Sequence, residues 1–238
     1  MQKHAVILGS GSDIGAALAY RLRRDGWGVA SVSHRQGLKG TTPARWDLVV
    51  CCYGTTEPIG SFWAVDPSAW RSSFSANLFL PLEQVRELYP RANPGASVCF
   101  FSGAGTSGPA PSYSAYATAK VALVKAVELM DAESPDCKFF IIGPGMVRTK
   151  LLDQALRAGP AAANFRRVAD FIESGDRGTS PDRIYECLLA CAAAPKTAVG
   201  GRNICAHLDD FRRLGELALA PDAFKLRRYR DGDFREES

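Results

Sequence analysis

Residues 5–15 read AVILGSGSDIG, in which a short apolar run leads directly into a glycine-rich turn. A helical pattern follows from Ile14 to Arg24, with Ile14, Leu18 and Leu22 on one face. Glycines in such a turn let the backbone pass close to a phosphate group, and the following helix offers unpaired N–H groups and a partial positive charge. The stretch therefore predicts a strand–turn–helix unit that binds a nucleotide, although a plain strand-to-helix turn has the same spacing.

Apolar runs and amphipathic stretches alternate along the rest of the chain. Six short runs are predicted to be strands: Ala5–Gly9, Val29–Ser33, Leu48–Cys52, Ser97–Phe101, Lys138–Ile142 and Asn203–Ala206. Helices are predicted at 14–24, at 67–89 with Asp66 as N-cap, at 114–130, and after the N-cap Ser180. This alternation predicts an α/β domain, a doubly wound parallel sheet with helices on both faces.

Composition narrows the class of protein. The chain has 238 residues, 46% of them hydrophobic and 23% charged, which fits one globular domain. A net charge of +4 is too small to indicate a nucleic-acid partner. No apolar run approaches the roughly 20 residues of a membrane span, and the first residues do not resemble a signal peptide. We therefore expect a soluble, cytoplasmic protein with no membrane partner.

The cysteines and histidines predict no metal site. The seven cysteines form no CxxC pair and mostly stand in apolar runs, as reduced core thiols do in cytosolic proteins. The three histidines show no ligand spacing with them.

Residues 1–208 are predicted to form the main domain, and residues 209–238 a C-terminal extension. Only 11 residues, Gln36–Trp46, separate the second predicted strand from the third, which is too few for a helix and a strand. Residues 150–178 form a helical segment with Arg157, Arg166 and Arg167, which we call the lid. The mixed-charge tail, 209–238, is expected to pack on the domain or on a neighbouring subunit.

Tyr116 and Lys120 are the leading candidates for chemistry. They stand at i and i+4 of a predicted helix, so their side chains share a face. A tyrosine pKa near 10 is too high for acid–base work at neutral pH, and a nearby ammonium is expected to lower it. The pair follows a strand ending at Ser102 and a loop rich in glycine, proline and serine, which favours an active site over a surface pair.

The order of these blocks resembles the short-chain dehydrogenase/reductase family. The turn from Gly9 to Gly15 resembles the TGxxxGIG turn, the block from Tyr116 to Lys120 the YxxxK element, and Gly143–Thr149 the PGxVxT element. The resemblance implies a Rossmann fold, here with six strands because the family's third strand is trimmed. It also implies an NAD(P)-dependent oxidoreductase.

The resemblance also implies roles for four side chains. Tyr116 is the general acid or base, Lys120 binds the nicotinamide ribose and tunes the tyrosine, and Asn77 holds a water of the proton relay. The family's serine, 13 residues before the tyrosine, is Gly103 here. Ser102 is expected to replace it through a one-residue shift in the loop, in preference to Thr106 or Ser107.

The resemblance further predicts the cofactor contacts, and NADP is favoured over NAD. The second predicted strand ends in Ser33–Gln36 without an acid for a ribose hydroxyl, whereas Arg35 can pair with a 2′-phosphate. Asp13 replaces a family glycine and is expected to point away from the phosphates and cap its own helix. The predicted cofactor-binding residues are Gly9, Gly11, Ser12, Asp13, Ile14, Gly15, His34, Arg35, Gly54, Tyr116, Lys120, Pro144, Gly145, Val147 and Thr149.

The predicted function is NADP(H)-dependent hydride transfer on a small carbonyl or secondary-alcohol substrate. Members of the family pair through helices matching 67–89 and 114–130, so a homodimer or homotetramer is expected. The alternative is a catalytically weak, nucleotide-binding sensor or scaffold. Asp13, Gly103 and the stretch Cys51–Gly54, which stands where the family has NNAG, favour that alternative.

Overall fold

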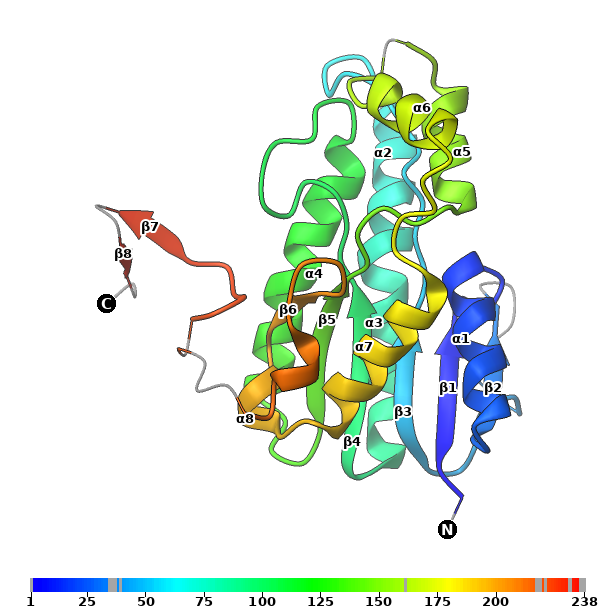
Figure 1. Cartoon of the computed structure of the whole chain (residues 1–238), viewed down its shortest axis with the longest axis vertical. Helices are drawn as coiled ribbons and strands as arrows, with labels where there is room; N and C mark the ends of the chain where they lie inside the picture. Colours follow the sequence, from blue (N-terminus) through cyan, green and yellow to red (C-terminus); the bar gives the residue numbers. More distant parts are fainter. Residues whose placement is uncertain are drawn as a thin grey trace.

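The computed structural model describes residues 2–33, 38, 40–160, 162–216, 220, 222–230 and 233–235. A parallel sheet in the order β2-β1-β3-β4-β5-β6 lies at its centre (Figure 1). Its strands are β1 (His4–Leu8), β2 (Gly28–Val32), β3 (Trp46–Cys51), β4 (Ala92–Phe101), β5 (Lys138–Gly143) and β6 (Asn203–Cys205). The predicted doubly wound α/β fold of six strands is confirmed.

Helices cover both faces of this sheet (Figure 1). One face carries α1 (Asp13–Arg24), α7 (Pro181–Ala193) and the short α8 (Lys196–Val199); the other carries α3 (Leu80–Leu88) and α4 (Ser114–Ala132). A further helix, α2 (Pro67–Phe74), precedes α3, with a π-helical turn η1 (Ser75–Phe79) between them. Within the described residues, no helix is long and apolar enough to cross a membrane.

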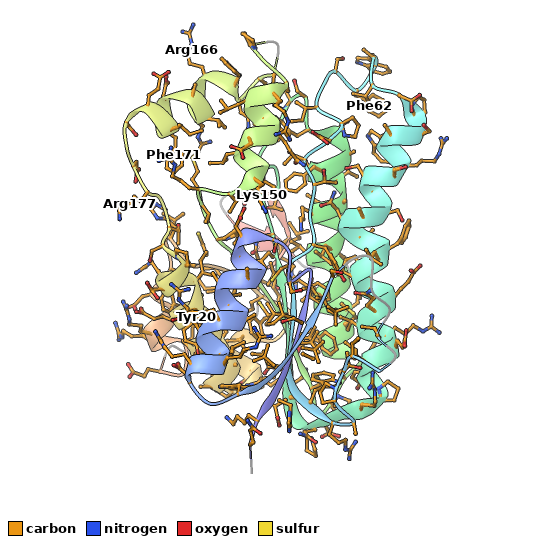
Figure 2. The ribbon with its side chains drawn as sticks, turned by 90° about the vertical axis from the view of Figure 1, so that its right-hand side faces the viewer. Tyr20, Phe62, Lys150, Arg166, Phe171 and Arg177 are labelled. Carbon is orange, nitrogen blue, oxygen red and sulfur yellow. The ribbon has the colours of Figure 1, made fainter. Side chains whose placement is uncertain are left out.

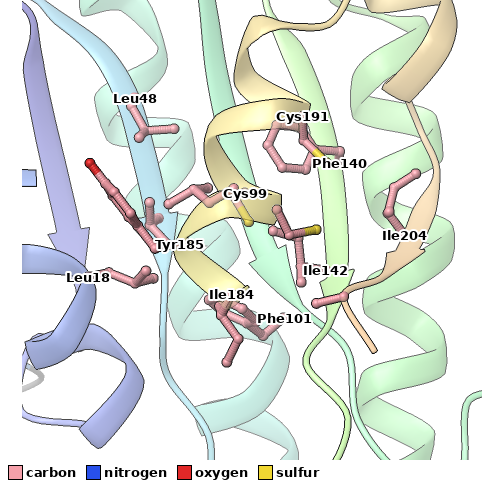
Figure 3. Packing of buried hydrophobic residues seen from close by; sticks show 14 of the residues in the cluster. Leu18, Leu48, Cys99, Phe101, Phe140, Ile142, Ile184, Tyr185, Cys191 and Ile204 are labelled. Atoms are coloured by element: carbon pink, nitrogen blue, oxygen red, sulfur yellow. The ribbon is translucent and has the colours of Figure 1, made fainter. Parts of the chain in front are cut away.

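Alternation along the strands divides the core into two clusters. In β4, Cys99 and Phe101 face α1 and α7, whereas Val98 and Phe100 face α3 and α4. Figure 3 shows the first cluster, in which side chains of α7 lie against β4 and β5. Because the central strands β1, β3, β4 and β5 are buried on both faces, they contain continuous apolar runs in the sequence.

The chain reverses its winding direction at β1, which lies between β2 and β3. In such sheets, the crevice at the carboxyl ends of the strands on either side of the reversal is the usual place for a ligand. The lid helices α5 (Lys150–Arg157) and α6 (Phe165–Glu173) lie beyond this edge of the sheet (Figure 1). The fold thus gathers the glycine turn, the end of β3 and the lid at one edge.

The helix caps follow the sequence in two of three cases. Asp66 caps α2 by accepting hydrogen bonds from the N–H groups of Ser68 and Ala69, and Ser180 caps α7 by accepting from Arg183. The third predicted cap, Asp13 on α1, is wrong. Ser12 caps that helix, because its Oγ accepts a hydrogen bond from the N–H of Gly15.

The seven cysteines are free, and all but Cys205 are buried. The tail contacts the domain at several points. Phe211 and Leu214 are buried in the core cluster that contains α7, and Arg202 Nη1 donates to the carbonyl oxygens of Ala220 and Ala223. The N–H of Asn203 donates to the carbonyl oxygen of Phe224 at 2.9 Å, and Arg227 forms an ion pair of 2.6 Å with Glu128 of α4. Beyond them, β7 (Arg228–Arg230) and β8 (Asp233–Arg235) pair as an antiparallel ribbon beside the domain (Figure 1).

Candidate active site

The glycine turn joins β1 to α1 in close contact with the end of β3. Gly9 has φ +80°, and a Cβ atom there would lie 2.9 Å from the carbonyl carbon of Cys52. A Cβ atom at Gly15 would lie 2.6 Å from the carbonyl oxygen of Gly9. Both positions therefore require glycine, as the turn pattern predicted. Gly11, in contrast, has open space around its Cα.

Asp13 links the glycine turn to the lid. Its Oδ2 accepts a hydrogen bond of 2.8 Å from the N–H of Lys150, the first residue of α5, and its Oδ1 lies 3.9 Å from Lys150 Nζ. Figure 2 shows Lys150 above the N-terminal end of α1. Asp13 thus caps a helix other than its own, one that begins far along the chain. The Asp13 carboxylate is turned toward α5, and Ser12 caps the N-terminus of α1.

The end of β3 continues into a loop that runs beside Asn77. A Cβ atom at Gly54 would lie 3.4 Å from Asn77 Oδ1 and 3.9 Å from Lys120 Nζ, so Gly54 lies between these two side chains. The predicted nucleotide-side glycine and two predicted catalytic residues therefore meet at one place. At the preceding position, the Tyr53 hydroxyl donates to Gln84 Oε1 at 2.8 Å.

Asn77 is fully buried in the π-helical turn η1. Its Nδ2 donates to the carbonyl oxygens of Thr55 at 2.9 Å and Ser73 at 2.8 Å, and its Oδ1 accepts from the N–H of Thr55 at 3.2 Å. A π-helical turn inside a helix is rare and is frequent at functional sites. The prediction of one unbroken helix over 67–89 is wrong, since the π-helical turn divides it into α2 and α3. The wider turn places the amide of Asn77 against the loop after β3.

Tyr116 and Lys120 lie side by side near the N-terminal end of α4, both buried. Lys120 Nζ lies 5.7 Å from the centre of the Tyr116 ring and donates a hydrogen bond of 2.9 Å to the carbonyl oxygen of Phe101. Burial lowers the pKa of Lys120 to about 8 and raises the pKa of Tyr116 to about 12. The predicted lowering of the tyrosine pKa is wrong for this structure, because the loss of hydration on burial raises this pKa.

Ser102, which was predicted to take the place of the family's catalytic serine, has its hydroxyl bound to another residue in this structure. Ser102 Oγ donates to Asn203 Oδ1 of β6 at 3.0 Å, so its hydroxyl is turned along the sheet edge toward Asn203. A Cβ atom at Gly103 would lie 1.9 Å from Tyr116 Oη. The tyrosine hydroxyl therefore occupies the space that a side chain at position 103 would take. Thr106 Oγ1 donates to the carbonyl oxygen of Gly103 at 3.1 Å.

The segment after β5 approaches the same edge of the sheet. Gly145 has φ +72°, and a Cβ atom there would lie 2.7 Å from Thr179 Oγ1, which is buried and has no hydrogen-bond partner. Val147 pairs with Gly178 in an isolated bridge, and Thr149 is the N-cap residue of α5. The predicted run from Pro144 to Thr149 therefore leads from the sheet edge directly into the lid.

Four further residues bear on the site: two that the sequence predicted and two that sequence reasoning missed. His34 and Arg35, predicted to select the cofactor, lie outside the described residues. Sequence reasoning missed Asn203, the partner of Ser102, and Gln154 of α5, which binds Thr55 and Thr56. Gln154 stands four residues after Lys150, so helical spacing within the lid was the signal available for it. Among the described residues, no group of His, Cys, Asp and Glu could hold a metal ion.

Comparison with known proteins gives consistent matches. Residues 40–204 match a family model described as enoyl-(acyl carrier protein) reductase. An uncharacterized oxidoreductase of Schizosaccharomyces pombe is 32% identical over 109 residues, and this match spans 45% of the chain and 44% of that protein.

Solved structures share the fold at low sequence identity. Ligand-free aldohexose dehydrogenase of Thermoplasma acidophilum superposes with a TM-score of 0.72 at 17% identity, covering 87% of this chain and 94% of that one. A small-chain dehydrogenase in complex with NADPH has a TM-score of 0.71 at 17% identity, covering 90% and 99%. A short-chain dehydrogenase/reductase of Saccharomyces cerevisiae has a TM-score of 0.71 at 18% identity, covering 90% and 98%.

The buried ammonium of Lys120 predicts a pH-dependent stability difference. The folded pKa of about 8 is below the ordinary value of 10.5, so the unfolded chain binds more protons between these values and stability rises with pH there. Relative to Lys120→Met, the wild type should therefore gain about 2 kcal/mol of unfolding free energy from about pH 7.5 to about pH 9.5. Urea unfolding at both pH values measures this, with the exposed Lys125→Met as control; a pH-independent difference would contradict the buried ammonium.

The contact between Gly103 and Tyr116 predicts the cost of adding a side chain. Gly103→Ala should lower the unfolding free energy by about 1–3 kcal/mol, because the tyrosine hydroxyl must be displaced. Gly108→Ala, in the same loop but with open space around it, is the matched control and should change little. Equal effects of the two substitutions in urea unfolding would show that position 103 has free space.

Proposed function

The chain belongs to the short-chain dehydrogenase/reductase family, and from this premise we propose that it transfers hydride between NADP(H) and a carbonyl or secondary alcohol. The observation that carries the proposal is the meeting of Asn77 and Lys120 at Gly54, with Tyr116 beside the lysine. This group lies at the carboxyl edge of the parallel sheet, where the glycine turn presents the N-terminus of α1.

The glycine turn fits a dinucleotide. Gly11 has open space around it next to the first turn of α1, and Gly9 and Gly15 bring the backbone within contact of the end of β3. Such a cradle suits a pyrophosphate. We assign Gly9, Gly11, Ser12, Ile14 and Gly15 to this cradle, with Asp13 acting through α5. Gly54, Pro144, Gly145, Val147 and Thr149 are assigned to the rest of the dinucleotide. When bound, the cofactor supplies or accepts the hydride.

The proton comes from Tyr116. Burial holds its pKa near 12, so the hydroxyl is protonated at neutral pH and ready to donate to a carbonyl oxygen. As the proton leaves, the ammonium of Lys120 stabilises the phenolate that forms. Lys120 also binds the nicotinamide ribose in this assignment, and Asn77 beside Gly54 holds the water that returns a proton to the tyrosine.

Ser102 is proposed as the second donor to the substrate oxygen, on the basis of its place next to Gly103. Its hydroxyl bonds Asn203 at 3.0 Å, so this role requires Ser102 to release Asn203 and turn. The same observation favours the alternative function, a catalytically weak nucleotide-binding sensor or scaffold. A protein of that kind would bind NADPH but would not oxidise it, whichever carbonyl compound is offered.

The proposed oligomeric state and cellular compartment rest on exposed apolar side chains and on the free cysteines. Phe79 and Leu129 are exposed apolar side chains on η1 and α4, in the two segments that we expect to form the interface of a homodimer or homotetramer. The seven free cysteines suit a reducing compartment such as the cytoplasm.

The catalytic assignment of Tyr116 is tested by removing one oxygen. Tyr116→Phe should lower kcat on any reduced ketone by about 10²–10⁴-fold, because the proton donor is lost. NADPH binding, followed by fluorescence titration, should stay unchanged. Tyr185→Phe is the control, since the Tyr185 hydroxyl donates to Asp25, the C-cap residue of α1, at the opposite end of that helix from the glycine turn. Wild-type turnover by Tyr116→Phe would rule out the assignment, and no turnover by wild type would favour the scaffold.

The preference for NADP is tested at Arg35. Arg35→Ala should raise the KM for NADPH at least about tenfold and leave the KM for NADH unchanged, because only the 2′-phosphate pairs with the guanidinium. Arg24→Ala, which removes an exposed arginine of α1, serves as control. A parallel change in the two KM values would argue against a 2′-phosphate contact.

A further inference from the structure

The lid helix α5 contacts the site through one polar face. Lys150, Gln154 and Arg157 recur at helical spacing, so they share this face. The N–H of Lys150 binds Asp13 of the glycine turn, Gln154 binds the loop after β3, and Arg157 lies 3.6 Å from Glu57 of the same loop. One short helix thus joins two segments that border the proposed cofactor site.

Gln154 makes the densest of these contacts. Its Oε1 accepts hydrogen bonds from Thr56 N–H at 2.9 Å and Thr56 Oγ1 at 2.7 Å. Its Nε2 donates to Thr55 Oγ1 at 3.3 Å. Thr56 is 9% exposed, so these bonds are shielded from water, which strengthens them. A single side chain of the lid therefore holds two consecutive loop residues.

Asn77 holds Thr55 from the other side. Its amide bonds both the N–H and the carbonyl oxygen of Thr55, at 3.2 and 2.9 Å. Thr55 is thus fixed between Gln154 of the lid and Asn77 of η1. Because the Oδ1 of Asn77 also lies beside Gly54, the direction of this amide at the site depends on where Thr55 is held.

Asp13 fixes the first turn of α5. The side chain of the N-cap residue Thr149 makes no capping hydrogen bond, and Asp13 supplies an acceptor for the N–H of Lys150 at 2.8 Å. A carboxylate at a helix N-terminus also interacts favourably with the helix dipole. The start of α5 is therefore seated on the glycine turn, which brings Gln154, one turn later, onto the loop after β3.

We propose that Gln154 is a positioning residue that acts through Thr55 to orient Asn77 beside Lys120. The inference rests on the proposed function for its effect on turnover, but the positioning itself is a property of the protein alone. The hydrogen bond from the Lys150 N–H to Asp13 holds the start of α5 in the place from which Gln154 reaches Thr55 and Thr56. Displacing the lid removes one of the two holds on Thr55 and leaves the Asn77 amide held by Ser73 and by a loosened Thr55, so chemistry is restricted to the seated lid.

The test is amide hydrogen exchange of the cofactor-free protein, followed by NMR. Gln154→Leu should speed exchange of the Thr56 N–H, which bonds Gln154, and also of the Thr55 N–H, which bonds Asn77, each by about tenfold. Gln154→Glu keeps the acceptor for Thr56 and should restore protection at Thr56 more than at Thr55. Asp153→Asn, an exposed neighbour on the same helix, should change neither.

Faster exchange at Thr56 alone, with Thr55 unchanged, would overturn the proposal, because Gln154 would then hold only its direct partner. Unchanged exchange at both amides in a folded Gln154→Leu variant would overturn it as well. In turnover with a reduced ketone, Gln154→Leu should lower kcat about tenfold at unchanged KM for NADPH, with Gln154→Glu partly restoring it. If wild type reduces no ketone while Thr55 responds as expected, the proposed function fails and the positioning stands.

Discussion

A buried hydrogen bond of 2.9 Å joins the ammonium of Lys120 to the carbonyl oxygen of Phe101, the last residue of β4. It fixes the start of α4 against the carboxyl end of the central strands. Tyr116 is carried with it, one helical turn earlier, and its hydroxyl comes to lie against Gly103. Burial of this group sets both pKa values, lowering that of Lys120 to about 8 and raising that of Tyr116 to about 12. An acid kept protonated beside a cation is suited to donating a proton and then tolerating the charge left behind.

Two departures from the family pattern have structural consequences of different kinds. Asp13 takes the place of a glycine in the turn, and its carboxylate binds the start of α5, so the lid is attached to the proposed cofactor cradle. Gly103 takes the place of the serine, and the space released is filled by the hydroxyl of Tyr116. The first departure adds a contact between the glycine turn and the lid. In the proposed reaction, the second leaves the substrate oxygen with fewer donors, unless Ser102 turns away from Asn203.

Features with local causes could be predicted from the sequence. Several of the six strands are continuous apolar runs, the glycine turn follows from steric demands within a few residues, and the i, i+4 spacing of Tyr116 and Lys120 places them on one helix face. The caps at Asp66 and Ser180 are equally local, since each accepts from residues two or three positions later. All of these elements were predicted correctly apart from shifts at their ends.

Features set by distant partners could not be predicted in this way. Ser12 and Asp13 are both good N-caps, and only the fold brings Lys150 to Asp13 and leaves α1 to Ser12. The bond from Ser102 to Asn203 joins β4 to β6 across the sheet edge. The pKa of Tyr116 depends on how deeply the finished fold buries it, which spacing along a helix does not reveal. The π-helical turn at Asn77 depends likewise on the loop it contacts.

The most direct test of the account is a crystal structure of the protein with NADP bound. The account predicts the pyrophosphate over Gly11 at the N-terminus of α1, the 2′-phosphate on Arg35, and the nicotinamide ribose within hydrogen-bond distance of Lys120 Nζ, beside Tyr116. A nucleotide bound away from the glycine turn, or one whose ribose leaves Lys120 and Tyr116 without contact, would contradict the assignment of this edge of the sheet as the active site.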